Sequence, residues 1–270
     1  MVNLNSLHEA AEVLERRLRL KTFPLAVKML ETEGDIAEGA TRPKRDLGHL
    51  IESCQGFAMS RREGKTVAML KEDMWCFEPV VGYGLAEPPQ EFLEGRNRFP
   101  DSAMTLEIAS TWAHNFPRLK FGKYIGAMSA PLMTANFQPD LVILYCDPSQ
   151  LTNLLIAVNC VYGHDLTCRL SGHAACVYSV VPAIQTGECQ VTSPCWGDRR
   201  EAIAQDYEVI FTVPIKKLEG LLSGLKHLAE HGWGLPIEFF MAPEPKMPKS
   251  YIKIGKTLGM KMDKAEAMDS

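Results

Sequence analysis

Hydrophobic residues recur along the chain with two kinds of spacing. Over residues 4–20 they return every three or four positions, which predicts an amphipathic helix. Short apolar runs predict buried strands at 25–30, 66–70, 124–131, 140–146 and 209–213. Further helices are expected at 46–61, 102–117, 147–162 and 215–231.

This order of elements predicts a fold in which helices flank a sheet. Strands followed by helices, as at 140–162, are typical of α/β or α+β architecture. We expect a mixed sheet in a single compact unit, residues 1–245, and leave a division into two lobes near residue 120 open. Residues 246–270 are rich in Pro, Lys and Met, and are expected to be an extended or disordered tail.

Composition and charge narrow the functional classes. The chain has 270 residues, of which 46% are hydrophobic and 23% charged, as in an ordinary globular protein. The net charge of −4 lacks the basic surplus of a nucleic-acid-binding protein. No apolar run approaches the ~18 residues of a membrane span, and no targeting segment is visible. We therefore expect a cytoplasmic protein that binds neither nucleic acid nor membrane.

The chain contains eight cysteines. Disulfides are rare in the cytoplasm, so these cysteines are expected to be core residues, redox groups or metal ligands. Cys146 ends an apolar run and Cys160 lies within one, so both are expected to be small core residues. Cys168 is ambiguous but favours the same interpretation. Cys189 follows a glycine turn and is also ambiguous.

The remaining four, Cys54, Cys76, Cys176 and Cys195, are the candidate metal ligands. Three of them lie near Gly or Pro turns, where a thiolate can be directed toward a shared centre. Four thiolates match a 4Fe-4S cluster or a structural zinc ion. No Cys-x-x-Cys pair occurs, which weighs against a zinc ribbon and excludes the ferredoxin-type run. Scattered buried cysteines remain the alternative.

Residues next to these cysteines are candidates for a supporting role. His173, three residues before Cys176, is a candidate hydrogen-bond donor, proton carrier or substitute ligand, or a polar turn residue. Arg199 is a candidate to contact cluster sulfur or clamp a carboxylate, or else forms a surface ion pair. Trp75 and Trp196 either shield a cluster from water or belong to the core.

Several of these segments together resemble the prokaryotic family called domain of unknown function 169. The resemblance covers Pro24–Met29, Cys54 with Arg62-x-Gly64-Lys65, Glu72–Cys76, Gly84-Leu85, Ala130–Leu132, Pro139-Asp140, Asp147–Gln150, Gly172–Cys176 and Pro194–Arg199. It implies that the four candidate cysteines belong to a recurring pattern. It also implies a setting in anaerobic or metal-rich metabolism, but no substrate.

Three functions are therefore consistent with the sequence, and whether the protein is an enzyme is left open. The first is an iron–sulfur protein that transfers electrons to a redox partner or binds a small anionic substrate. The second is a small-anion-binding or scaffold protein with structural zinc or no metal. The third is an enzyme with Cys54 or Cys195 as nucleophile. Self-association into a homo-oligomer is left open.

Overall fold

A single six-stranded sheet forms the centre of the protein. This computed structural model describes residues 4–237 and 247–261. The strands run in the order β2-β3-β1-β4-β6-β5, and every neighbouring pair is antiparallel. Their bounds are β1 Leu25–Leu30, β2 Val67–Leu70, β3 Gly126–Pro131, β4 Leu141–Cys146, β5 Gln190–Thr192 and β6 Val209–Pro214. The α/β class is confirmed, whereas the strand pairing is antiparallel throughout rather than mixed.

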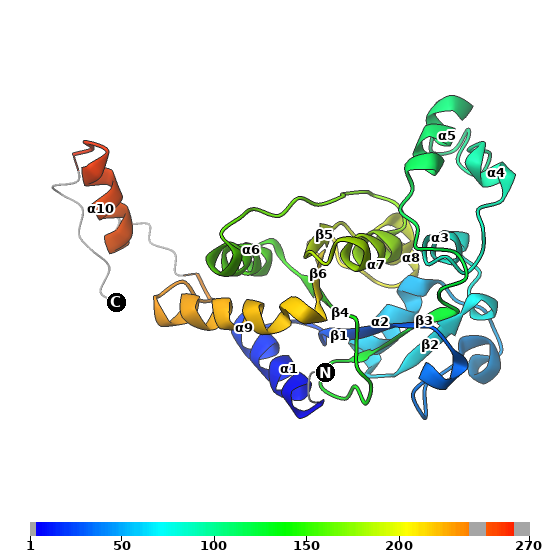
Figure 1. Cartoon of the computed structure of the whole chain (residues 1–270), viewed down its shortest axis with the longest axis horizontal. Coiled ribbons are helices and arrows are strands. Elements are labelled where there is room, and N and C mark those ends of the chain that lie inside the picture. The colour runs from blue at the N-terminus through cyan, green and yellow to red at the C-terminus, as the bar shows by residue number, and fades with distance from the viewer. Residues whose placement is uncertain (1–3, 238–246, 262–270) are drawn as a thin grey trace.

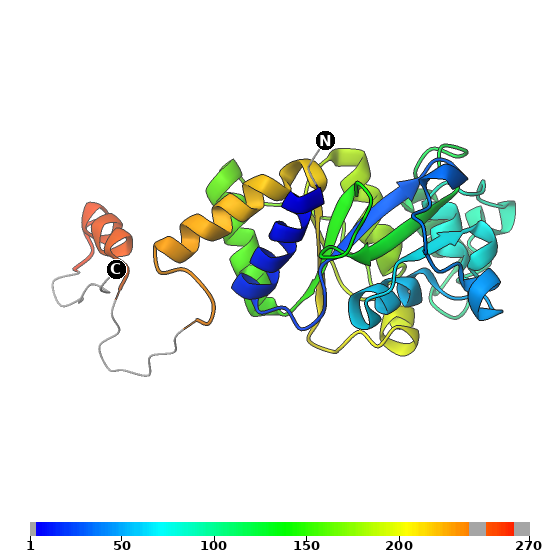
Figure 2. The ribbon, with the colours of Figure 1, turned by 90° about the horizontal axis from the view of Figure 1, so that it is seen from below.

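One face of the sheet is covered by three helices, α1 (Leu4–Leu18), α6 (Pro148–Tyr162) and α9 (Ile215–Glu230). Figure 2 shows α1 and α9 lying along this face. Val142 and Leu144 of β4 point into the apolar layer beneath them. Asp147 caps α6 and accepts a hydrogen bond from the Gln150 N–H at 2.8 Å, with Pro148 at the first helical position.

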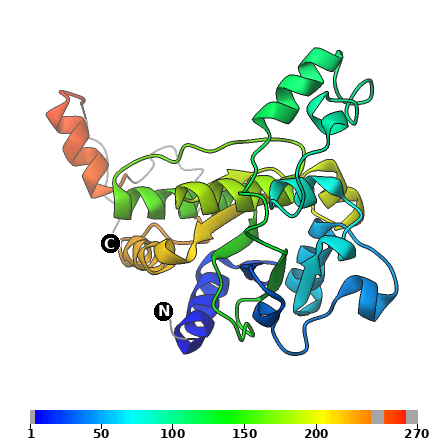
Figure 3. The same ribbon diagram turned by 45° about the vertical axis from the view of Figure 1, so that its right-hand side comes forward.

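The opposite face carries α2 (Ser53–Glu63), α3 (Phe77–Gly82), α7 (Ala175–Thr186) and α8 (Trp196–Glu201), as Figure 1 shows. Ile143 and Tyr145 of β4 point to this side, because successive strand residues alternate between faces. Beyond α3 lies a small helical lobe made of α4 (Gln90–Leu93) and α5 (Leu106–Asn115), which we call the α4–α5 lobe (Figure 3).

The helix limits correct three sequence-based expectations. The helix predicted at 46–61 begins only at Ser53, because a π-helical turn at Pro43–Leu47 ends at Gly48, which has φ +78°. The short turns Glu33–Asp35 and Lys71–Asp73 and the helices α3, α4, α7 and α8 were not predicted. Part of the expected extended tail is helix α10, Lys249–Thr257, while residues 246 and 262–270 lie outside the described residues.

No helix in the described part of the chain combines the length and the apolar character that crossing a membrane requires.

Candidate four-cysteine site

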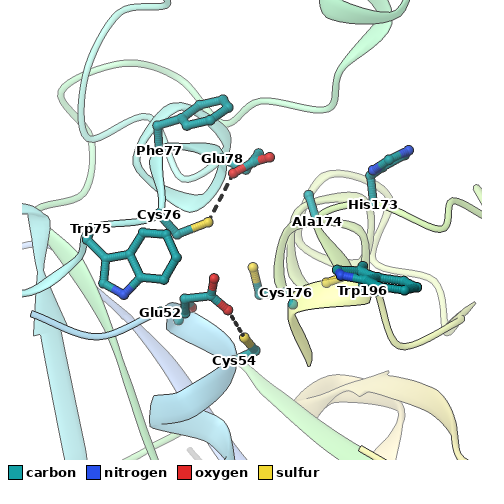
Figure 4. A pocket seen from close by; sticks show the side chains of 13 residues that line it. Glu52, Cys54, Trp75, Cys76, Phe77, Glu78, His173, Ala174, Cys176 and Trp196 are labelled. Atoms are coloured by element: carbon teal, nitrogen blue, oxygen red, sulfur yellow. Dashed lines mark hydrogen bonds between the residues drawn. The ribbon is translucent and has the colours of Figure 1, made fainter. Parts of the chain in front are cut away.

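All four candidate cysteines line one cavity. Cys54, Cys76, Cys176 and Cys195 come from four different segments and border a space of about 310 Å³ on the α2/α7 side of the sheet. Figure 4 shows the sulfurs of Cys54, Cys76 and Cys176 directed toward this space. The sequence-based grouping of these four residues therefore corresponds to a real juxtaposition in the fold.

Each of the four cysteines lies at the beginning of a helix. Cys54 and Cys176 are the second residues of α2 and α7, and Cys76 and Cys195 immediately precede α3 and α8. The prediction that Cys54 lies in the second half of its helix is wrong, because α2 begins seven residues later than expected. The first N–H groups of a helix lack internal partners and carry partial positive charge. One of these N–H groups, that of Asp198 in α8, donates to the Cys195 Sγ at 3.4 Å.

Backbone pairing places Cys54 beside Cys76. Ile51 and Met74 form an isolated parallel bridge, and the Trp75 N–H donates to the Ile51 carbonyl at 3.3 Å. The turn before this bridge is held by the buried carboxylate of Asp73, which accepts from the Arg42 Nε at 2.6 Å. The two chain segments consequently run side by side into α2 and α3.

A buried tyrosine links α2 and α3 to α7. Tyr83 is fully buried, and its hydroxyl donates to the Cys176 carbonyl at 3.2 Å. The Ser53 hydroxyl lies 3.4 Å from the Tyr83 hydroxyl oxygen. One side chain thus holds the beginnings of α2 and α7 together directly behind the cavity.

Helix α8 is fixed to the sheet through Asp198. The Tyr145 hydroxyl donates to the Asp198 Oδ2 at 3.0 Å, whereas the buried Oδ1 has no hydrogen-bond partner among the described residues. Burial raises the pKa of Asp198 to about 7. Arg61 stacks on the Tyr145 ring at 3.8 Å and pairs with the buried carboxylate of Glu208 at 2.9 Å. A buried polar chain therefore extends from the cavity toward the end of α2.

Two carboxylates that the sequence analysis missed contact the thiols. Cys54 Sγ donates to Glu52 Oε2 and Cys76 Sγ donates to Glu78 Oε2, both at 3.0 Å (Figure 4). The local sequences Glu-Ser-Cys and Cys-Phe-Glu are the signal that could have revealed them, since each acid lies two residues from its cysteine. Burial raises the pKa of Glu52, and the hydrogen bond from Cys54 opposes this effect.

The surroundings keep these thiols protonated in the metal-free protein. Burial raises the pKa values of Cys54 and Cys76, and the neighbouring Cys176 raises both further. Burial also raises the pKa of Cys176, with Cys195 as the next contributor. For Cys195, burial raises the pKa, but the N–H groups of Ala175, Asp198 and Gly197 oppose the rise. Cys176 therefore acts on the pKa values of Cys54 and Cys76, and Cys195 acts on that of Cys176.

Three of the four residues that were predicted to support the cysteines line the cavity, and the fourth does not. His173, Trp75 and Trp196 all line the cavity. Trp196 is 77% exposed and Trp75 is 53% exposed, so they form the mouth of the cavity rather than the protein core. Arg199 does not line it, because its guanidinium donates to the Gln205 carbonyl at 2.7 Å and lies 3.9 Å from Asp206.

The other four cysteines lie outside the cavity. Cys146 is buried beneath α6, as expected, and Cys189 is buried in the same apolar layer. Cys168 is partly buried and accepts from the Val191 N–H at 3.3 Å. The expectation that Cys160 is a core residue is wrong, because it lies on the exposed side of α6.

Thiols are soft ligands, which suit iron–sulfur clusters and zinc. Within residues 4–237 and 247–261, no group of three or more His, Cys, Asp or Glu side chains is already close enough to hold a single metal ion. The cavity instead separates its thiols around a central space and directs two of them at carboxylates.

Comparison with known proteins identifies a family. A family model, DUF169, described as "Uncharacterised ArCR", matches residues 13–224, which is most of the chain and includes all four cavity cysteines. No curated protein and no solved structure matches.

Proposed function

The chain belongs to the DUF169 family, and we propose that it is a cytoplasmic iron–sulfur protein of anaerobic or metal-rich metabolism. In this proposal Cys54, Cys76, Cys176 and Cys195 bind a 4Fe-4S cluster. The single observation that carries the proposal is that these four cysteines, taken from four remote segments, border one cavity. When bound, such a cluster supplies one-electron transfer or a site for a small substrate.

The polarity of the helices around the cavity supports an anionic centre. A cluster with four thiolate ligands carries net negative charge, which buried surroundings must compensate. Helices α2 and α7, of 11 and 12 residues, both begin at the cavity and present their positive ends to it. Hydrogen bonds to cluster sulfur tune its potential, and the Asp198 N–H already donates to Cys195.

A cluster places a different demand on the spacing of its thiolates than a single metal ion does. A single zinc ion requires its ligands in one tight tetrahedron, whereas in a 4Fe-4S cluster each thiolate binds a different iron and lies farther from the others. The lack of a tight group among the described residues therefore does not count against a cluster. Structural zinc remains the alternative that metal analysis decides.

Glu52 and Glu78 give the thiol protons a destination. A cysteine must lose its proton to bind metal. Two of the four thiols already donate to these carboxylates at 3.0 Å. We therefore assign Glu52 and Glu78 as local proton acceptors while the site is loaded.

The high thiol pKa values do not favour a cysteine nucleophile. The thiolate is the reactive form, and catalytic cysteines have lowered pKa values. Burial raises the pKa of both Cys54 and Cys195. A metal that displaces the protons is the better use of such thiols.

Anaerobic purification tests the proposal. The full chain should be brown, with broad visible absorption and matched amounts of iron and acid-labile sulfide. Colourless protein that contains one zinc would contradict the cluster and support the structural-metal alternative. Protein that takes up neither metal under reducing conditions would contradict both.

A further inference from the structure

Arg98 is a buried cation without an ionic partner. It lies between α4 and α5, is 6% exposed, and stacks on the Trp112 ring at 3.9 Å. No side chain or carbonyl in the described part of the chain accepts a hydrogen bond from its guanidinium, and none forms an ion pair with it. The guanidinium nitrogens are not among the fully buried polar atoms that lack a partner, so the packed side chain still presents free N–H donors to solvent.

The neighbouring charged groups do not supply Arg98 with an ionic partner. Glu78 influences Arg98 through its charge, but its carboxylate is engaged by Cys76 at 3.0 Å. His173 contacts the same indole from its edge, with ring centroids 6.1 Å apart and an interplanar angle of 71°. Arg98 and His173 therefore contact one aromatic ring, and His173 also lines the four-cysteine cavity.

We propose that Arg98 and His173 form a recognition site for the oxyanion of a small substrate, beside the four-cysteine cavity. The planar guanidinium offers a fork of N–H donors that matches a carboxylate or a phosphate. Burial and the positive charge of Arg98 lower the pKa of His173, which favours the neutral imidazole, and this form can donate one N–H. Trp112 orients the fork by stacking.

The arrangement also sets the position of the substrate. Because His173 contacts the same indole as Arg98 and also lines the cavity, an oxyanion held at Arg98 lies on the His173 side of the cavity. The remainder of the molecule can then extend toward the thiols. This inference rests on the proposed function only for the identity of the reacting centre, because oxyanion recognition needs no metal.

Calorimetric titration of the full chain tests the site, with acetate, succinate and inorganic phosphate as probes. We expect at least one probe to bind, and the probe that binds distinguishes a carboxylate from a phosphate site. Arg98→Met should weaken that binding at least about tenfold, because a charge-assisted hydrogen-bonded pair is lost. Arg96→Gln is the matched control, since Arg96 lies in the same loop but is exposed and paired with Glu94.

A stability measurement separates recognition from a structural role. Removing an unpaired buried charge should leave the denaturation midpoint of Arg98→Met unchanged or higher. If that variant does not fold, Arg98→Lys, which keeps the charge but loses the fork, should weaken binding instead. Unchanged affinity in the folded variant would overturn the proposal.

Titrating both the brown and the metal-free protein separates this inference from the cluster proposal. Binding to metal-free protein supports the oxyanion site even if no cluster can be loaded. Brown protein that binds none of the probes overturns the oxyanion site alone. In a further outcome, the wild type binds no oxyanion and the Arg98→Met variant loses its colour. This result would mean that Arg98 neutralises the charge of Glu78, and it would also overturn the oxyanion site.

Discussion

The carboxylate of Glu52 lies directly over the backbone of Gly197, so that a Cβ at position 197 would come within 2.8 Å of Glu52 Oε2. The contact joins the beginning of α2 to that of α8, two helices that each contribute a cysteine to the cavity. Only glycine allows the carboxylate to approach this closely while it accepts from Cys54.

Gly197→Ala should therefore displace Glu52 and disturb the cavity. We expect a lower iron content per chain because the end of the Glu52 side chain must move, and a loss of less than about 1 kcal/mol in unfolding free energy, since alanine favours the helix. Denaturant unfolding and metal analysis measure the two effects. Gly172→Ala is the control, since a Cβ there meets no atom within 4 Å. Wild-type values for Gly197→Ala would show that the contact is unimportant.

Single cysteine substitutions should divide the eight thiols into two groups. Serine at position 54, 76, 176 or 195 should abolish or greatly reduce the visible absorption, because the cluster loses one ligand. Cys160→Ser is the control and should keep the colour, because Cys160 is exposed and outside the cavity. Visible spectra at equal protein concentration give the comparison, and colour that survives all four substitutions would refute the ligand set.

The raised thiol pKa values predict that metal-free protein loses stability at alkaline pH. In the unfolded chain a thiol titrates near 9.0, whereas in the fold the pKa values of Cys54, Cys76 and Cys176 lie higher. The contribution of each is therefore fully present below about pH 9 and is lost above it, at up to ~1.4 kcal/mol per pH unit for a buried thiol. Denaturant unfolding in reductant between neutral pH and ~10.5 measures the slope.

The variant with serine at all four positions provides the comparison for this slope. It lacks the titrating groups and should lose less stability per pH unit than the wild type. Identical slopes would mean that the thiols do not titrate as their surroundings require.

Asp198 should produce a different pH dependence. Its pKa is about 7 in the fold, against 3.8 for an unperturbed aspartate in the unfolded chain, so its contribution is present below about pH 4 and is lost as the pH rises to 7. Asp198→Asn keeps an acceptor for the Tyr145 hydroxyl and should be a few kcal/mol more stable than wild type at pH 7 or above.

At pH 4 the advantage of Asp198→Asn should nearly vanish, which unfolding measurements at the two pH values detect. The exposed Asp206→Asn serves as control and should show no such trend. An equal effect of Asp198→Asn at both pH values would mean that Asp198 is ionised throughout.

Breaking the ion pair between Arg61 and Glu208 should strongly lower the unfolding free energy. Both side chains are buried, at 0% and 4% exposure, and Glu208→Gln leaves the guanidinium without its counter-charge. We expect a loss of about 3–5 kcal/mol in unfolding free energy. Glu230→Gln breaks the exposed pair with Lys226 and should cost less than about 1 kcal/mol. Similar losses for the two variants would contradict the importance of burial.

Much of the fold could be predicted because most of its strands are largely apolar. The runs that contain Val27, Val142 and Phe211 are almost entirely buried, and their composition marks them as strands. The strand order could not be predicted, since antiparallel neighbours are chosen by packing between remote segments. Helix α7 was missed because Pro182 lies inside it and disfavours a helix interior.

The site was predicted only in part, because some of its residues are brought together by packing between remote segments. Gly and Pro near a cysteine mark a turn, and this local signal applied to three of the four cysteines that line the cavity, but also to Cys189, which lies outside it. Glu52, Glu78 and Arg98 acquire their roles from burial, which depends on segments far away in the sequence. Arg199, in contrast, has a suggestive position beside Cys195 but turns to Gln205.

The alternation of side chains along β4 gives Tyr145 one further effect. Leu144 and Cys146 point toward α6, whereas Tyr145 points to the cavity side and reaches Asp198. If β4 slipped by one residue against β6, every side chain would change face, and the phenol hydroxyl would enter an apolar layer without an acceptor. The tyrosine–aspartate contact therefore penalises mispaired sheets, and helps to ensure that chains reaching a compact state have aligned their strands correctly.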